Sequence, residues 1–377
     1  MRRRAFGLLI GPMGLASLGL TACQGPRPDG SFGPTLGPDG TVESGPVAIL
    51  LPLTGRLAEI GKPMLRAAQL ALSVPGSPIL IVKDTAGSPD AAAQAAENAI
   101  AEGARLILGP VTAAETGRVA VVARRGRVPV LAFTNDQAQS QPNVWTLGIT
   151  PGQQVRRLVV AAAQSNKTPV AALLPDNDFG RAMAEELNRA AAGGGQPPPF
   201  IRMHGPGKDS ITAVVNELAG TAGPEQVMPF GSILLGAVGG DLKFFAAAFP
   251  AVKIDTKSVQ IMGPGLWIDP ASGSGVLAGA WCAAPDPAAR QALIRDYNAK
   301  YKEPPRPVAD LAYDGGSIAR VLAAQGRMNV AGLTQQAGFA GVDGLLTLLP
   351  DGQVRRSLSL FRVEQRKVVK IADAPTV

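Results

Sequence analysis

Short apolar runs alternate with helical patterns along most of the chain. The first run, Val47–Leu51, ends at Pro52 and is followed by apolar residues at helical spacing from Met64 to Leu72. The further strands predicted in this series are residues 79–82, 106–108 and 128–133, with helices between them. Short buried strands alternating with helices of 10–15 residues predict a parallel sheet with helices on both faces.

The same pattern then starts again. Its predicted strands are residues 170–174, 200–203, 232–235 and 258–262, and its predicted helices are residues 180–192, 210–220 and 241–249. Two longer helices are predicted at 288–301 and 309–325. Residues 344–349, 357–363 and 368–371 are typical of antiparallel strands around a turn at Pro350-Asp351-Gly352. The repetition predicts an α/β fold of two doubly wound, three-layer lobes.

The N-terminal segment is typical of an export signal. Three arginines precede an apolar run from Ala5 to Leu20 that is interrupted by Gly and Pro and is shorter than the ~20 residues of a membrane-spanning helix. Its end, Leu20-Thr21-Ala22-Cys23, resembles the bacterial lipobox. The resemblance implies that residues 1–22 are a lipoprotein signal peptide and that the Cys23 thiol carries lipid. Ordinary signal cleavage beside an incidental cysteine is the alternative.

A flexible tether is expected at residues 23–45. Six Gly and four Pro lie between Gln24 and Gly45, and a chain of this kind has a reach of roughly 25 Å. The lipid would therefore anchor a periplasm-facing body to a membrane. Gln24 directly after Cys23 favours the outer membrane over the inner membrane, by resemblance to the sorting signal of enteric bacteria.

Composition excludes several chemistries. The chain has 377 residues, of which 46% are apolar and 17% charged, as in globular proteins. One His and two Cys cannot supply a zinc site of four thiolates or of two thiolates and two imidazoles, and any triad would depend on His204 alone. Without Arg2, Arg3 and Arg4 the formal charge falls from +7 to +4, and the other basic residues are scattered. We therefore expect no catalytic residues, metal, cofactor or nucleic-acid partner.

Candidate binding residues lie where the predicted strands end. In doubly wound sheets, ligands bind at the carboxyl ends of the strands, where loops and helix N-termini offer free backbone N–H groups. The polar or aromatic candidates in these loops are Thr54, Thr112, Thr134, Asn135, Asp136, Asp178, Phe179 and Trp267. For Trp267, stacking on a solute and packing between the lobes are both open.

Four motifs carry a resemblance to a known family. They are Leu50–Gly55, Gly103–Pro110, Asp178–Arg181 and Ala312–Asp314. In this order they resemble the type 1 periplasmic-binding fold, and most closely its Leu/Ile/Val-binding proteins, from about Pro46 to Ile371. The resemblance implies a hinged cleft that closes on a small solute. It assigns residues 46–150 plus 284–343 to lobe 1 and residues 151–283 plus 344–377 to lobe 2, with crossovers near residues 150, 283 and 343.

The chain departs from the amino-acid binders of that family at four positions. These proteins hold the α-ammonium of the ligand with an acidic residue, and Gly265 stands at that place here. Ala113 replaces a binding Ser, Phe179 replaces a Tyr, and Val238 occupies the place of another Tyr. A buried ammonium without a counter-charge costs several kcal/mol, so these departures argue against tight binding of amino acids.

The same departures resemble a sub-branch, the lipoproteins known as penicillin-binding-protein activators. Residues 263–270, 283–287 and 338–344 carry this resemblance. It implies a non-enzymatic, lipid-anchored regulator of peptidoglycan synthesis, whose partner would be a peptidoglycan synthase. The alternative is a solute-binding receptor of an ABC transporter, with an amino acid or another small polar molecule as ligand.

Overall fold

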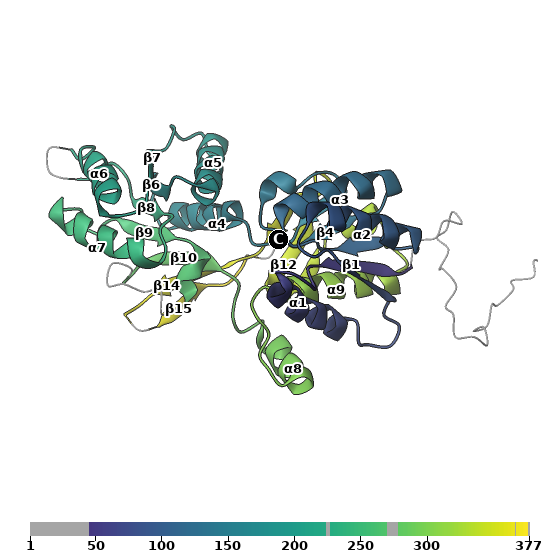
Figure 1. Cartoon of the computed structure of the whole chain (residues 1–377). Helices are drawn as coiled ribbons and strands as arrows, with labels where there is room; N and C mark the ends of the chain where they lie inside the picture. The colour runs from purple at the N-terminus through teal and green to yellow at the C-terminus, as the bar shows by residue number, and fades with distance from the viewer. Residues whose placement is uncertain (1–44, 224–226, 270–277, 366, 376–377) are drawn as a thin grey trace, which may run out of the picture. The chain divides into compact units, whose positions relative to one another are not determined.

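The first five strands of the chain, between residues 47 and 146, form a parallel sheet. The computed structural model describes residues 45–223, 227–269, 278–365 and 367–375 (Figure 1). The first sheet is parallel throughout and has the strand order β2-β1-β3-β4-β5. Its strands are β1 (Val47–Leu51), β2 (Leu80–Asp84), β3 (Leu106–Leu108), β4 (Val130–Ala132) and β5 (Val144–Thr146).

The expected signal peptide, the expected lipid attachment at Cys23 and the expected tether up to residue 44 lie outside the described residues. Within the described part of the chain, no helix is long and apolar enough to cross a membrane.

Alternate residues of β1 face two different cores. Val47, Ile49 and Leu51 belong to one apolar cluster, whereas Ala48 and Leu50 belong to another, because successive side chains of a strand point to opposite faces. The first cluster is completed by α1 (Ala58–Ala71), α8 (Gln291–Tyr301), α9 (Ala309–Ala324) and α10 (Val330–Leu333). The second cluster is completed by α2 (Pro89–Ala101) and α3 (Ala113–Gly126). The sheet is therefore the middle of three layers.

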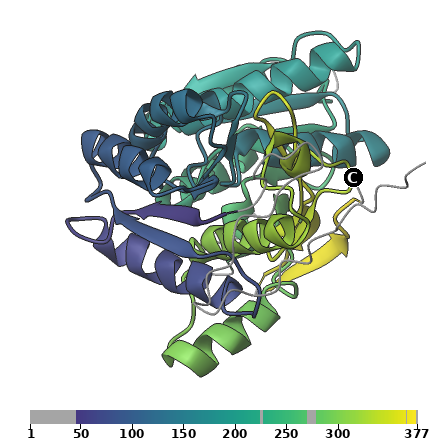
Figure 2. The same cartoon turned by 90° about the vertical axis from the view of Figure 1, so that its right-hand side faces the viewer.

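Helices α1 and α9 are far apart in sequence but lie side by side, in purple and yellow-green in Figure 2. Gly316 of α9 allows this close approach. A Cβ at that position would lie 2.9 Å from the Cβ of Ala71 and 3.3 Å from the carbonyl oxygen of Ala68. The C-terminal part of the chain thus completes the first lobe.

The second sheet repeats this order and adds two antiparallel strands. Its order is β15-β14-β10-β9-β8-β6-β7. Strands β6 to β10 are parallel, and β14 and β15 are antiparallel to their neighbours. Its strands are β6 (Val170–Pro175), β7 (Ile201–His204), β8 (Ser232–Leu235), β9 (Gln260–Gly263), β10 (Trp281–Ala284), β14 (Ser359–Val363) and β15 (Val368–Ala372).

Helices cover both faces of the second sheet as well. Ala171 and Leu173 of β6 face one core cluster, and Val170, Ala172 and Leu174 face the other. The helices on these faces are α6 (Lys208–Ala219) and α7 (Leu242–Ala251) on the first, and α4 (Pro151–Gln164) and α5 (Asp178–Gly193) on the second. The two doubly wound units predicted from the sequence are confirmed.

The chain passes between the two sheets after β5, after β10 and after a small third sheet. That third sheet is antiparallel and consists of β11 (Phe339–Gly341), β12 (Gly344–Leu348) and β13 (Val354–Arg356). Leu346, Leu348 and Val354 lie in the core of the first lobe. The expected crossover near residue 343 is therefore wrong, because the apolar face of β12 and β13 packs on the first lobe. The chain enters the second core at Leu358.

Candidate functional site

The strand orders place two pairs of loops at the points where ligands bind in such sheets. In the first sheet β1 lies between β2 and β3, so the loops that follow β1 and β3 are neighbours. In the second sheet β6 lies between β7 and β8, which makes the loops after β6 and β8 neighbours. These are the topological switch points of doubly wound sheets. All the candidate residues follow the strands β1, β3, β4, β6, β8 and β9.

The loop after β1 is held by the carboxylate of Asp84, at the end of β2. Its Oδ1 accepts hydrogen bonds from the backbone N–H groups of Leu53 (2.8 Å), Thr54 (3.3 Å) and Ala86 (2.8 Å). Its Oδ2 accepts from the Thr54 hydroxyl at 2.6 Å. Desolvation opposes ionisation, but the hydrogen bonds outweigh it and lower the pKa of Asp84. Thr54 therefore keeps only the lone pairs of its hydroxyl oxygen for a ligand.

The loop after β3 leads into the N-terminus of α3. Thr112 caps the helix, since its hydroxyl oxygen accepts from the Glu115 N–H at 3.2 Å and the Glu115 carboxylate accepts from the Thr112 N–H at 3.1 Å. Ala113 and Ala114 follow, and their backbone N–H groups have no acceptor in the described part of the chain. The positive end of the helix dipole and two free N–H groups make this loop suited to an anion.

The loop after β4 is stabilised by its own side chains. Thr134 is buried, and its hydroxyl oxygen accepts from the Asp136 N–H at 3.1 Å. The Asp136 carboxylate accepts from the Ala138 N–H at 3.0 Å and from the Gln139 side chain at 3.2 Å. Asn135 is exposed. Asp136 thus caps the short helix η1 (Gln137–Gln139).

In the second lobe, the candidate carboxylate after β6 is already paired. Asn177 caps α5 through the Gly180 N–H at 3.0 Å. The fully exposed Asp178 forms an ion pair of 2.8 Å with Arg181, which also pairs with Asp176 at 2.7 Å. Phe179 is half-buried and packs against the core that contains α4 and α5. These acidic side chains lie in a solvated cluster with their own counter-charge.

Gly265 occupies a position with no room for a side chain. A Cβ there would lie 2.7 Å from the carbonyl oxygen of Ala283 and 3.4 Å from the Cβ of Ala284. The Gly265 N–H donates to the side-chain oxygen of Gln154 at 2.6 Å, and the Gln154 amide in turn donates to the Thr150 carbonyl at 3.4 Å. The place expected to hold an acid is therefore filled by backbone and by a buried amide.

Trp267 is fully buried inside the second lobe. Its ring lies over Gly263, where a Cβ would be 2.2 Å from the ring, and its N–H donates to the Ala237 carbonyl at 3.1 Å. The indole therefore packs within one lobe, and neither stacking on a solute nor packing between the lobes describes it. Two other apolar side chains are exposed nearby in the fold, Val238 after β8 (42% exposed) and Leu266 after β9 (64% exposed).

The sequence patterns did not identify Gln154 or Leu266 in this region. They indicated that Asp84 shapes the turn after it, as its bond to the Ala86 N–H does, but not that it also holds the loop after β1. The capping box Thr150-Pro151-Gly152-Gln153, with both reciprocal hydrogen bonds formed, marks the start of α4. It could have placed Gln154 in the first turn of that helix. Leu266 could have been named from the sequence as well, because it lies in the loop directly after a predicted strand. In the described part of the chain, no group of three His, Cys, Asp or Glu side chains could hold a metal ion.

Residues 46–367 match the family model of the periplasmic binding proteins, and the chain belongs to this family. A search of curated proteins gives no significant match.

Solved structures share the fold across most of the chain. A structure from Rhodospirillum rubrum described as a branched-chain amino acid ABC transporter has a TM-score of 0.73 at 19% identity, covering 87% of this chain and 100% of its own. A solute-binding protein of an ABC transporter from R. palustris, in complex with benzoate, has a TM-score of 0.56 at 20% identity, with 89% and 97% covered. The branched-chain amino acid transporter substrate-binding protein from Streptococcus pneumoniae, in complex with isoleucine, has a TM-score of 0.57 at 17% identity. The match covers 89% of this chain and 100% of the other.

Proposed function

We propose that this protein is the periplasmic solute-binding component of an ABC transporter, and that its solute is a small organic carboxylate without an amino group. The observation that carries the proposal is the closed position at Gly265. The Ala283 carbonyl and Gln154 fill the space beside it. An ammonium would find no counter-charge there, at a cost of several kcal/mol.

The first lobe supplies the groups that a carboxylate needs. The free N–H groups of Ala113 and Ala114 stand at the N-terminus of a 14-residue helix, beside the switch point of the sheet. Backbone N–H groups at such a helix end favour a carboxylate through hydrogen bonds and the helix dipole. The bound benzoate of the R. palustris protein belongs to the same chemical class.

The second lobe presents apolar side chains at its strand ends. The exposed Val238 and Leu266 follow the neighbouring strands β8 and β9. Apolar groups at a binding site gain free energy when a ligand covers them, at roughly 25 cal/mol per Å². A solute with a carboxylate at one end and an apolar body at the other suits both sets of loops.

A matched pair of ligands tests the proposal. Leucine and 4-methyl-2-oxopentanoate share the carboxylate and the branched alkyl chain, and they differ in having an amino group or a keto group. We expect thermal stabilisation by 4-methyl-2-oxopentanoate or benzoate, and at least tenfold weaker binding of leucine and isoleucine, because a ligand that binds only the folded state raises its stability. Stronger stabilisation by leucine would contradict the proposal.

The regulator of peptidoglycan synthesis, which the sequence analysis placed first, has less support than solute binding. The similar solved structures from Rhodospirillum rubrum, R. palustris and Streptococcus pneumoniae are all described as transporter proteins. Capture of a peptidoglycan synthase by the protein, together with no thermal response to any carboxylate or amino acid, would reverse this order.

We also propose that lipid on Cys23 anchors the protein to a membrane, which the lipobox-like Leu20-Thr21-Ala22-Cys23 supports. Gln24 favours the outer membrane, which suits the regulator of peptidoglycan synthesis, whereas a receptor that delivers solute to an ABC transporter works at the inner membrane. Metabolic labelling with a palmitate analogue should mark the wild-type chain and leave a Cys23→Ala variant unlabelled. Separation of inner and outer membranes on a density gradient tests the location.

A further inference from the structure

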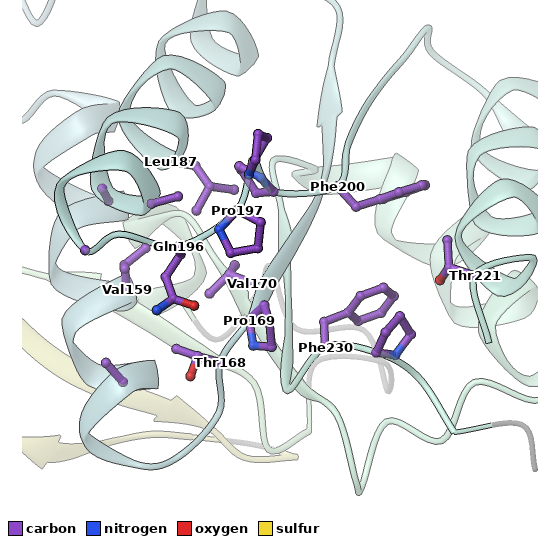
Figure 3. A pocket seen from close by; sticks show the side chains of 17 residues that line it. Val159, Thr168, Pro169, Val170, Leu187, Gln196, Pro197, Phe200, Thr221 and Phe230 are labelled. Atoms are coloured by element: carbon purple, nitrogen blue, oxygen red, sulfur yellow. The ribbon is translucent and has the colours of Figure 1, made fainter. Parts of the chain in front are cut away.

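A concave region of the second lobe lies away from the strand-end loops described above. It has a volume of about 490 Å³ and adjoins the starts of β6, β7 and β8 (Figure 3). Pro169 directly precedes β6, Phe200 directly precedes β7, and Phe230 comes shortly before β8. Because these strands are parallel, their starts share the edge of the sheet opposite to the one that carries Asp178 and Val238. We call this region the amino-end pocket.

The lining of the amino-end pocket carries no charged side chain among the described residues. Its lining includes the apolar Val159, Leu187, Phe200 and Phe230 and the polar Thr168 and Gln196. A charged ligand would lose its hydration there without gaining a counter-charge. The pocket is thus suited to an uncharged molecule.

The apolar walls of the pocket are rigid. The rings of Phe200 and Phe230 stack at 6.5 Å between centroids with 30° between their planes. The guanidinium of Arg202 lies 4.2 Å from the centroid of Phe200, which fixes that ring further. Five prolines line the pocket, and their backbone has little freedom to lose. A preformed wall lowers the entropic cost of binding a ligand.

The polar groups of the pocket lie mostly at one end. In Figure 3, Gln196 and Thr168 lie toward Val159, whereas Phe200 and Phe230 lie toward Thr221. The Thr221 hydroxyl is satisfied by the Leu218 carbonyl at 2.6 Å. Thr168 and Gln196 line the pocket, and their side chains make no hydrogen bond within the described part of the chain. They can therefore donate to or accept from a ligand.

We propose that the amino-end pocket is a second small-molecule site, which binds a neutral molecule of up to about three rings with one or two hydrogen-bonding groups. The size follows from volume, since an apolar cavity of ~150 Å³ accommodates one benzene molecule. The aromatic and proline walls hold the apolar body, and Gln196 and Thr168 meet the polar group. This site is independent of the carboxylate site proposed above, because it lies at the other edge of the sheet.

Two fluorescent probes that differ only in charge test this site. N-phenyl-1-naphthylamine is neutral, and 1-anilinonaphthalene-8-sulfonate is the same molecule with a sulfonate. We expect saturable binding of one neutral probe per full-length chain, with a rise in emission, and at least tenfold weaker binding of the sulfonate. Equal binding of both probes, or no saturable binding of the neutral probe, would overturn the proposal.

Substitutions on one helix locate the bound probe. Ala191 of α5 lines the pocket, whereas its neighbour Ala192 is exposed and does not. Ala191→Trp should fill the pocket and weaken probe binding at least tenfold, while Ala192→Trp should leave it within twofold. Ala163→Trp, from an exposed position of α4 that also lines the pocket, gives a second blocking variant if Ala191→Trp does not fold. Unchanged affinity in a folded blocking variant would refute this location.

Discussion

The backbone N–H of Gly265 donates a hydrogen bond of 2.6 Å to the side-chain oxygen of Gln154. This bond joins the loop after β9 to the first turn of α4, and the end of β10 closes the third side through the Ala283 carbonyl. The glycine is therefore required by packing. The position where the resemblance places an acid is packed here against the backbone of the second lobe.

Gly265→Ala should destabilise the protein. The added Cβ would lie 2.7 Å from the Ala283 carbonyl oxygen, so backbone must move, and overpacking of this kind costs about 1–3 kcal/mol. Thermal unfolding followed by circular dichroism should show a melting temperature lowered by a few degrees. Gly240→Ala is the matched control, because a Cβ there has no neighbour within 4 Å. Equal melting temperatures for the two variants would show that position 265 has room.

Trp267→Phe separates packing from ligand contact. The substitution removes the hydrogen bond to the Ala237 carbonyl and part of a fully buried ring, which should cost about 2–4 kcal/mol of unfolding free energy. Solute affinity should stay within about twofold, since the indole is not exposed to a ligand. Trp281→Phe, at a half-buried position, should cost less. Loss of solute affinity with unchanged stability would instead indicate stacking on the solute.

The sequence predicted which loops form the candidate site, but not which side chains in them are exposed. Loop positions follow from strands such as Val47–Leu51, whose apolar run and terminal proline are local signals. The burial of Trp267 depends on Gly263 beneath its ring and on Ala237 of another loop, which are tertiary contacts. Strand β5 has only three residues, too few to show an alternation of apolar and polar side chains. The packing of β12 on the first lobe depends on tertiary contacts that no local sequence pattern indicates.

Asp84→Asn should weaken the loop after β1, and its effect should depend on pH. The native pKa of Asp84 is lowered, so above pH ~4 its ionised carboxylate stabilises the folded state, and this contribution is lost as the pH falls through the native pKa. Melting temperatures measured from pH 6 to pH 3 should therefore fall more steeply for the wild type than for the variant. Asp209→Asn, at an exposed position of α6, serves as the control.

Three buried carboxylates face two guanidiniums in the first lobe. Asp310 of α9 forms an ion pair with Arg290, and Asp314 Oδ2 lies 3.7 Å from Arg356 Nη1, with Asp343 as the third acid. Desolvation raises the pKa of Asp310 to about 7 and that of Asp314 to about 6, and it also raises the pKa of Asp343. One carboxylate is in excess of the available positive charge.

Asp314→Asn should therefore become more favourable as the pH rises. The native wild type binds more protons than the unfolded chain between pH ~4, where a free Asp titrates, and about pH 7, so its stability contribution from this cluster decreases across that window. The variant leaves two carboxylates for two guanidiniums, and its amide oxygen can still accept from the Val342 N–H, as the Asp314 carboxylate does at 2.8 Å. The difference in melting temperature, variant minus wild type, should increase from pH 4 to pH 7. Parallel curves over this range would mean that the cluster does not titrate there. Arg356 also donates to the Leu147 carbonyl at 2.7 Å, just before the chain first leaves the first sheet, so the same series reports on the charge balance beside this crossover.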